Sequence, residues 1–119
     1  MLTPFGKALR KLRIDRGMLL KDMADGIGIA SSFLSGMETG RKSIPEGTVE
    51  KIGSWAKLDK IGIKQLTLAA EMSKQEFKIT ANSSFTDNDR EAAMLLARFG
   101  ELPRSQRDKI HAIFKKELP

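Results

Sequence analysis

Few side chains in this sequence could perform covalent or metal chemistry. There are no cysteines, which excludes a disulfide framework and a thiolate metal site, and a single histidine, His111, is too few for a histidine zinc site. The paired carboxylates of Asp22 and Asp25, and of Asp87 and Asp89, have the positions of helix-start acids and not of an acid–base pair. No nucleophile has a matching base. We therefore expect no catalysis, no metal ion and no cofactor.

Two glycine-containing segments imitate phosphate-binding motifs. Residues 36–43 read GMETGRKS, but their glycine spacing differs from that of a phosphate loop and no strand precedes them. Residues 26–31 read GIGIAS, which lacks the third glycine of a dinucleotide fingerprint and follows a helical pattern. Neither segment predicts a nucleotide site.

The overall charge indicates a polyanionic partner. The 119 residues include 21 Lys and Arg against 15 Asp and Glu, which gives a formal net charge of +6 and a pI near 9.8. This balance favours nucleic acid first and an anionic membrane surface second. No apolar run approaches the roughly 20 residues of a membrane-spanning helix, and the first residues lack the apolar core of a signal peptide. We expect a soluble, intracellular protein with room for one domain or one and a half.

Apolar periodicity predicts that the first part of the chain is helical. Thr3 is placed to cap a first helix with Pro4 at its first position, and Gly17 is placed to end it. The third helix follows the second after a break of only three residues that begins at Gly28. Two short helices joined by a tight glycine-containing turn are the physical form of a helix-turn-helix. The predicted helices that follow the first cover about residues 19–27, 31–39, a segment after Pro45 and about 61–73.

The pattern changes at Lys74, so we expect a domain over residues 1–73 and a second segment over residues 74–119. Polar and apolar residues alternate over 76–81, which predicts a short strand. Thr86 with Asp89 resembles a capping box and opens a helix over about 87–99 that Gly100 closes. A last helix is predicted over about 104–117. The fold class is therefore mainly α, with a possible short β-strand between the first domain and a C-terminal helical hairpin.

From Phe5 to about Leu58 the sequence resembles the lambda-repressor-like, or XRE, helix-turn-helix family. That stretch is under half of the chain, and it is the order and spacing of the matching residues together that make the match specific. The resemblance implies a five-helix DNA-binding domain whose third helix, the recognition helix, enters the major groove. The matching residues are Arg13, Met23-Ala24, Gly28-Ile29, Phe33-Leu34-Ser35, Met37-Glu38, Gly40-Arg41-Lys42 and Pro45.

The resemblance also implies roles for residues at matching positions. Arg13 and Glu38 would form a buried structural ion pair. The base-contacting positions would be Ser31, Ser32, Ser35 and Gly36, at the start of the recognition helix. The phosphate-contacting positions would be Lys21, Arg41 and Lys42.

The sequence departs from the family pattern where bases would be read. Ala30 replaces the usual Ser or Thr cap of the recognition helix, so the cap either shifts to Ser31 or is lost. Leu20 stands where members of the family commonly have a glutamine, at the start of the second helix. Serine hydroxyls both donate and accept hydrogen bonds, so they discriminate bases poorly. Either Gly36 permits close approach of the backbone, or specificity comes from DNA shape and the neighbouring Arg41 and Lys42.

Three functions follow from these observations. The leading one is a bacterial, phage or plasmid transcription regulator in the cytoplasm and at the nucleoid, most often a repressor, which binds a palindromic operator in double-stranded DNA as a homodimer. The dimer would form through residues 74–119, either by pairing strand 76–81 with its copy or by packing the C-terminal helices. The second is an antitoxin that binds a toxin and represses its own operon. The third is a protein-interaction adaptor that kept the fold and lost DNA readout. A possible protein partner is a toxin or, for the regulator, RNA polymerase.

Overall fold

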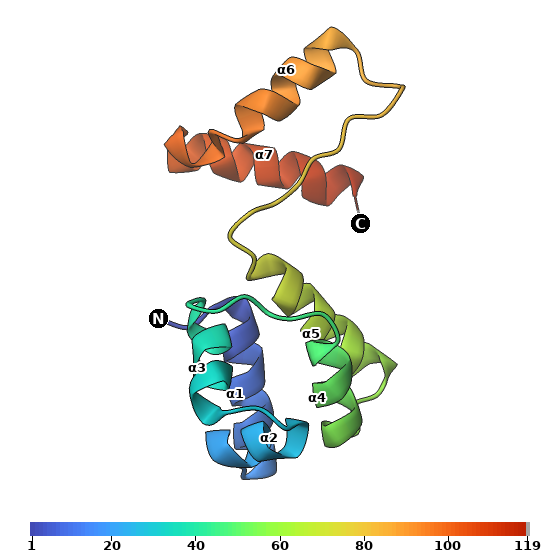
Figure 1. The fold of residues 1–119 in the computed structure, drawn as a ribbon. Coiled ribbons are helices and arrows are strands. Elements are labelled where there is room, and N and C mark those ends of the chain that lie inside the picture. The colour runs from blue at the N-terminus through green and yellow to red at the C-terminus, as the bar shows by residue number, and fades with distance from the viewer. Residues whose placement is uncertain (119) are drawn as a thin grey trace. The chain divides into compact units, whose positions relative to one another are not determined.

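The computed structural model describes residues 1–118, which contain α-helices, one 3₁₀ helix and no strand (Figure 1). The chain forms two compact units, the first comprising residues 1–77 and the second beginning at Lys78. The mainly helical fold class predicted from the sequence is confirmed. No helix within the described residues combines the length and the apolar character needed to cross a membrane.

The first unit contains five helices whose ends lie close to the predicted ones. Thr3 caps the first helix, because its hydroxyl accepts a hydrogen bond from the Gly6 N–H at 3.0 Å, and Pro4 occupies the first turn. Asp59 caps the fifth helix in the same way through the Gly62 N–H, at 2.7 Å. The helices are α1 (Pro4–Arg16), α2 (Leu20–Ile27), α3 (Ser31–Thr39), α4 (Thr48–Ala56) and α5 (Lys60–Met72).

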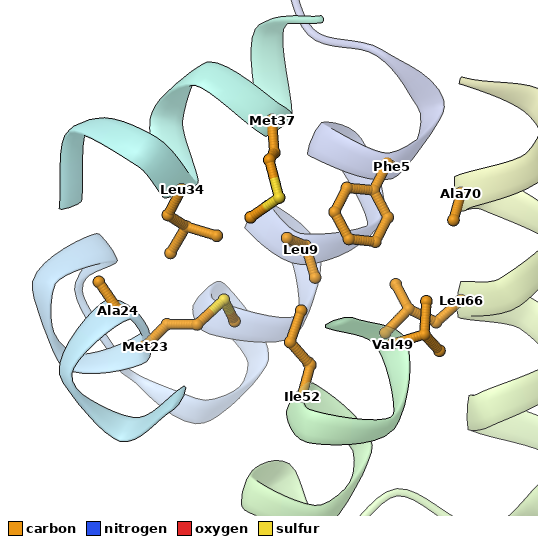
Figure 2. Close-up of a cluster of buried hydrophobic side chains, with 10 residues drawn as sticks. All are labelled: Phe5, Leu9, Met23, Ala24, Leu34, Met37, Val49, Ile52, Leu66 and Ala70. Atoms are coloured by element: carbon orange, nitrogen blue, oxygen red, sulfur yellow. The ribbon is translucent and has the colours of Figure 1, made fainter. Parts of the chain in front are cut away.

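Each of these five helices contributes side chains to one hydrophobic core. Phe5 and Leu9 of α1 lie at its centre and are fully buried. Figure 2 shows the remaining side chains converging on them from α2 to α5. The helices are too short to be stable alone in water, so this shared burial holds the recognition helix in place. The other core residues are Met23, Ala24, Leu34, Met37, Val49, Ile52, Leu66 and Ala70.

The first unit extends beyond the end of α5. The Ser73 hydroxyl accepts a hydrogen bond from the Phe5 N–H at 2.8 Å and donates one to the Ala69 carbonyl at 2.7 Å. The Gln75 amide donates to the Gly40 carbonyl at 3.1 Å. These bonds attach the segment after α5 to the start of α1 and to the residue that follows α3.

The second unit contains α6 (Asp87–Leu96), the 3₁₀ helix η1 (Phe99–Glu101) and α7 (Arg104–Glu117). The predicted capping box is present, with the Thr86 hydroxyl accepting from the Asp89 N–H and the Asp89 carboxylate accepting from the Thr86 N–H. The predicted end of this helix at Gly100 is wrong. From Ala97 the backbone N–H groups bond three residues back, which ends α6 at Leu96 and leads into η1.

The predicted strand over residues 76–81 is also wrong. Within the described residues this segment has no backbone partner, and its side chains, including Phe77 and Ile79, are exposed. Alternation alone does not form a strand, because a strand needs a neighbouring backbone to complete its hydrogen bonds.

The second unit has no buried residue over its described range, 78–118. Six side chains are half-buried, and large apolar side chains such as Met94, Ile113 and Phe114 remain exposed. Its helices therefore lack the apolar core that stabilises α1 to α5. The half-buried residues are Phe85, Ala93, Leu96, Phe99, Arg107 and Ile110.

Candidate nucleic-acid interface

A tight turn joins α2 to α3. Gly28 adopts a left-handed conformation with φ of 77°, which a glycine reaches without strain. The Ile29 N–H bonds to the Ala24 carbonyl at 3.0 Å and the Gly28 N–H to the Asp25 carbonyl at 3.3 Å, which is the Schellman arrangement. The chain then enters α3 at Ser31, so α2 and α3 form the predicted helix-turn-helix.

Glu38, near the end of α3, is held by α1 at both its side chain and its backbone. Arg13 Nη1 lies 2.6 Å from Glu38 Oε2, Arg13 Nη2 lies 3.0 Å from Oε1, and both residues are buried. The Glu38 carbonyl accepts hydrogen bonds from the Thr3 N–H and the Thr3 hydroxyl, each at 3.0 Å. A Cβ atom added at Gly6 would lie 2.2 Å from the same carbonyl oxygen. The arrangement fixes how α3 lies against α1.

The three serines lie on the outer side of the first turns of α3. Ser32 is exposed and Ser31 and Ser35 are half-buried, and Ser35 is a helix-surface neighbour of both others because it follows them by four and three residues. None of the three hydroxyls has a hydrogen-bond partner among residues 1–118. They are therefore available to an external partner.

The start of α3 has no side-chain cap. Ala30 occupies the N-cap position in an extended conformation, and only its carbonyl takes part, accepting from the Phe33 and Leu34 N–H groups. Of the two outcomes expected from the sequence, the cap is lost and does not shift to Ser31. Phe33 is half-buried and packs against the core.

Gly36 occupies a different place from the serines. It is buried, and the side chain of Lys42 lies across it, so that a Cβ atom at Gly36 would come within 2.6 Å of Lys42 Cγ. Its missing side chain makes room for Lys42.

The three predicted phosphate-contacting residues carry exposed cations at the two ends of the helix-turn-helix. Lys21 lies in the first turn of α2, where its ammonium is 3.7 Å from the Asp25 carboxylate in an exposed pair. Arg41 and Lys42 follow α3 directly, after the left-handed Gly40 that ends the helix. Along the chain, one of these cations precedes the serines of α3 and the other two follow them.

Two residues with structural roles were not identified from the sequence. Arg16, the last residue of α1, donates a hydrogen bond to the Ala56 carbonyl at the end of α4, so its guanidinium caps a neighbouring helix. Thr39 accepts a hydrogen bond from Arg41 Nε at 3.2 Å. Neither could be found from spacing alone, because each depends on how distant or non-helical segments fold together.

Among the described residues no group of three acidic or histidine side chains is arranged to hold a metal ion.

Comparison with known proteins agrees with this geometry. Residues 9–53, from the middle of α1 to near the end of α4, match the family model described as Helix-turn-helix. No curated protein and no solved structure matches the chain. The matched segment contains the Arg13–Glu38 pair, the Gly28 turn and the serine face of α3. Residues 9–53 therefore form a helix-turn-helix domain similar to those of lambda-repressor-like, XRE-type DNA-binding transcription regulators.

Proposed function

We propose that this protein is a transcriptional repressor that binds a palindromic operator as a homodimer, with α3 of each copy in the major groove. The observation that carries this proposal is the outer face of α3. Its serine hydroxyls have no partner among residues 1–118, and exposed cations precede them on α2 and follow them after α3. Ser31, Ser32 and Ser35 would contact bases, and Lys21, Arg41 and Lys42 would contact phosphates.

The short side chains of the α3 face support a two-fold arrangement. Serine hydroxyls discriminate bases less well than the bidentate contacts of longer side chains. One such face therefore supplies little sequence discrimination, whereas two faces on paired half-sites double the number of contacts. Part of the specificity would come from the shape of the DNA between the half-sites.

The second unit supports dimerisation through its helices. A unit of about 40 residues without a buried side chain does not offset the conformational entropy that its folding costs. Covering Met94, Ile113 and Phe114 with the same residues of a second copy would supply the missing core.

Selection from a pool of random duplexes at moderate salt, followed by sequencing, tests the proposal. The expected product is a palindrome whose half-sites lie about one helical turn apart. Placing the recovered duplex over a promoter in a reporter strain should then lower transcription. Salt-sensitive binding without an enriched sequence, or a rise in transcription, would contradict the repressor proposal, and no binding would favour the adaptor.

Two substitutions separate the proposed base and phosphate contacts. Ser32→Ala should reduce the preference for the recovered duplex over a random one and leave the salt dependence unchanged. Lys21→Ala should weaken binding to both duplexes equally and reduce the slope of log K against log salt by about one. If both variants behave alike, the assignment of these residues is wrong.

A further inference from the structure

The last turn of α3 contacts both cations that follow it. These contacts involve Gly36 and Thr39 on the helix and Arg41 and Lys42 in the loop. They differ from the contacts of Lys21, whose only polar partner among residues 1–118 is the neighbouring Asp25 on its own helix. The two loop cations are therefore held by the recognition helix itself.

Lys42 is held at its backbone and along its side chain. Its N–H donates a hydrogen bond to the Gly36 carbonyl at 3.0 Å. A Cβ atom at Gly36 would lie 2.6 Å from Lys42 Cγ and 3.4 Å from Lys42 Cβ. Because the atoms in the way are near the root of the side chain and the backbone is bonded, a side chain at position 36 would force Lys42 into another rotamer or break the bond.

Arg41 is held through the Thr39 hydroxyl. Its Nε donates to Thr39 Oγ1 at 3.2 Å. That hydroxyl in turn lies 3.1 Å from the Ser35 carbonyl and 3.3 Å from the Gly36 carbonyl, to one of which it donates. The hydroxyl thus connects the guanidinium to the backbone of α3, while Arg41 as a whole remains exposed.

We propose that Gly36 and Thr39 are positioning residues that orient Lys42 and Arg41 toward the DNA phosphates beside the recognition helix. The inference rests on the proposed phosphate contacts of these two cations. Long basic side chains lose rotamer freedom when they bind, and side chains already restrained in the free protein lose less. Gly36 would thus contribute to DNA binding by what it leaves open for Lys42, and not by touching a base.

A double-mutant cycle on Gly36 and Lys42 tests the first half of the proposal. The probes are the best duplex from the selection and a random-sequence duplex of the same length. Lys42→Ala should weaken binding to both duplexes several-fold and reduce the salt slope by about one. Gly36→Ala should do the same, and the double variant should bind no worse than Lys42→Ala alone.

Thermal unfolding separates this positioning role from damage to the fold. Alanine has a higher helix propensity than glycine, so loss of binding without a lower melting temperature is the expected result for Gly36→Ala. A direct approach of the Gly36 backbone to a base predicts something else. In that case Gly36→Ala would lower the preference for the selected duplex and leave the salt slope unchanged. It would also weaken binding as much in the Lys42→Ala variant as in the unsubstituted protein.

Thr39→Val tests the second half and keeps the proposal testable if Gly36→Ala does not fold. It removes the hydroxyl that holds Arg41, and it should reduce binding and the salt slope in the same direction as Arg41→Ala. Thr67→Val is the matched control, because the Thr67 hydroxyl donates to the Ile63 carbonyl at 2.8 Å on the exposed side of α5. That variant should bind as the unsubstituted protein does.

The outcomes distinguish this inference from the proposed function. If Lys42→Ala and Arg41→Ala leave the salt slope unchanged, the proposed phosphate contacts are wrong and the positioning role falls with them. If those variants lower the slope but Gly36→Ala and Thr39→Val do not, the phosphate contacts stand and the positioning role is wrong.

Discussion

Arg13 of α1 and Glu38 of α3 form a buried, two-bond ion pair, with N–O distances of 2.6 and 3.0 Å. Arg13 Nη1 also lies 3.5 Å from the sulfur of Met23 on α2, so one guanidinium contacts both helices of the helix-turn-helix, α2 and α3. Charges this well matched and this far from water stabilise one geometry strongly, since a shift of either helix would leave a charge buried without its partner.

Removing one member of this pair should be far more damaging than removing both. Glu38→Ala leaves the Arg13 charge buried and should lower the free energy of unfolding by about 3–5 kcal/mol. The double variant Arg13→Met with Glu38→Leu should recover most of that loss, because it removes both charges from the core. Urea denaturation measures both effects.

The exposed pair of Lys11 and Asp15 is the control for this experiment. It lies on the same helix, α1, at 3.4 Å, with both side chains exposed. Asp15→Asn should change the free energy of unfolding by no more than about 0.5 kcal/mol. If Glu38→Ala lowers the free energy of unfolding by no more than Asp15→Asn does, the buried pair does not hold α3 in place.

A side-chain cap at Ala30 should stabilise the recognition helix. Ala30 is exposed and extended, the conformation that an N-cap residue needs, but it has no oxygen to accept a backbone N–H of the first turn. Ala30→Thr should therefore raise the free energy of unfolding by about 1 kcal/mol. Ala30→Val has the same shape without the hydroxyl and should give no such gain. Equal melting temperatures for the two variants would contradict the capping argument.

The helices of the first unit could be predicted because their signals are local. Thr3 with Pro4, the glycine at position 28 and the apolar spacing of α1 to α3 each determine structure over a few residues. The same holds for the capping box at Thr86. Such signals remain readable in a single sequence because neighbouring residues provide the groups that complete them.

Features that depend on distant or irregular segments could not be predicted in the same way. The strand at residues 76–81 failed because no neighbouring backbone is present to pair with it in residues 1–118. The burial of Gly36 follows from the path of the loop after α3, which returns Lys42 over the helix. Sequence spacing placed Gly36 beside the serines, but Lys42 covers it, whereas Ser32 is exposed and Ser31 and Ser35 are half-buried.

The turn between α6 and α7 should show a pH-sensitive ion pair. Arg98 donates two hydrogen bonds to the Glu101 carboxylate, at 2.9 and 3.0 Å, and these bonds lower the pKa of Glu101 below its ordinary value. A carboxyl whose pKa is lowered by folding stabilises the folded state above its unfolded pKa, and that contribution is lost as the pH falls through the folded value. NMR titration of the Glu101 carboxyl should show the lowered pKa, and Arg98→Gln should raise it. An unchanged pKa in that variant would show that the pair does not form.

A charge placed on the exposed apolar side of α7 should prevent dimerisation. Ile113 is 62 % exposed in the single chain, so a charge there does not disturb a core within the monomer, but it would be buried without a partner in the proposed interface. We expect the unsubstituted protein to have twice the 13.2 kDa chain mass by light scattering, and Ile113→Glu to have the mass of one chain. The variant should also lose affinity for the palindrome more than for a single half-site.

Matched substitutions on other surfaces identify the interface. Leu68 on α5 has an exposed fraction of 60 %, which is similar to that of Ile113. Leu68→Glu therefore introduces the same charge on the first unit and should leave the dimer intact. Ile79→Pro would prevent residues 76–81 from pairing as strands between copies, and it should also leave the dimer intact. A monomer produced by Leu68→Glu would place the interface on α5, and one produced by Ile79→Pro would place it on the extended segment. A dimer that survives Ile113→Glu would show that α7 does not form the interface.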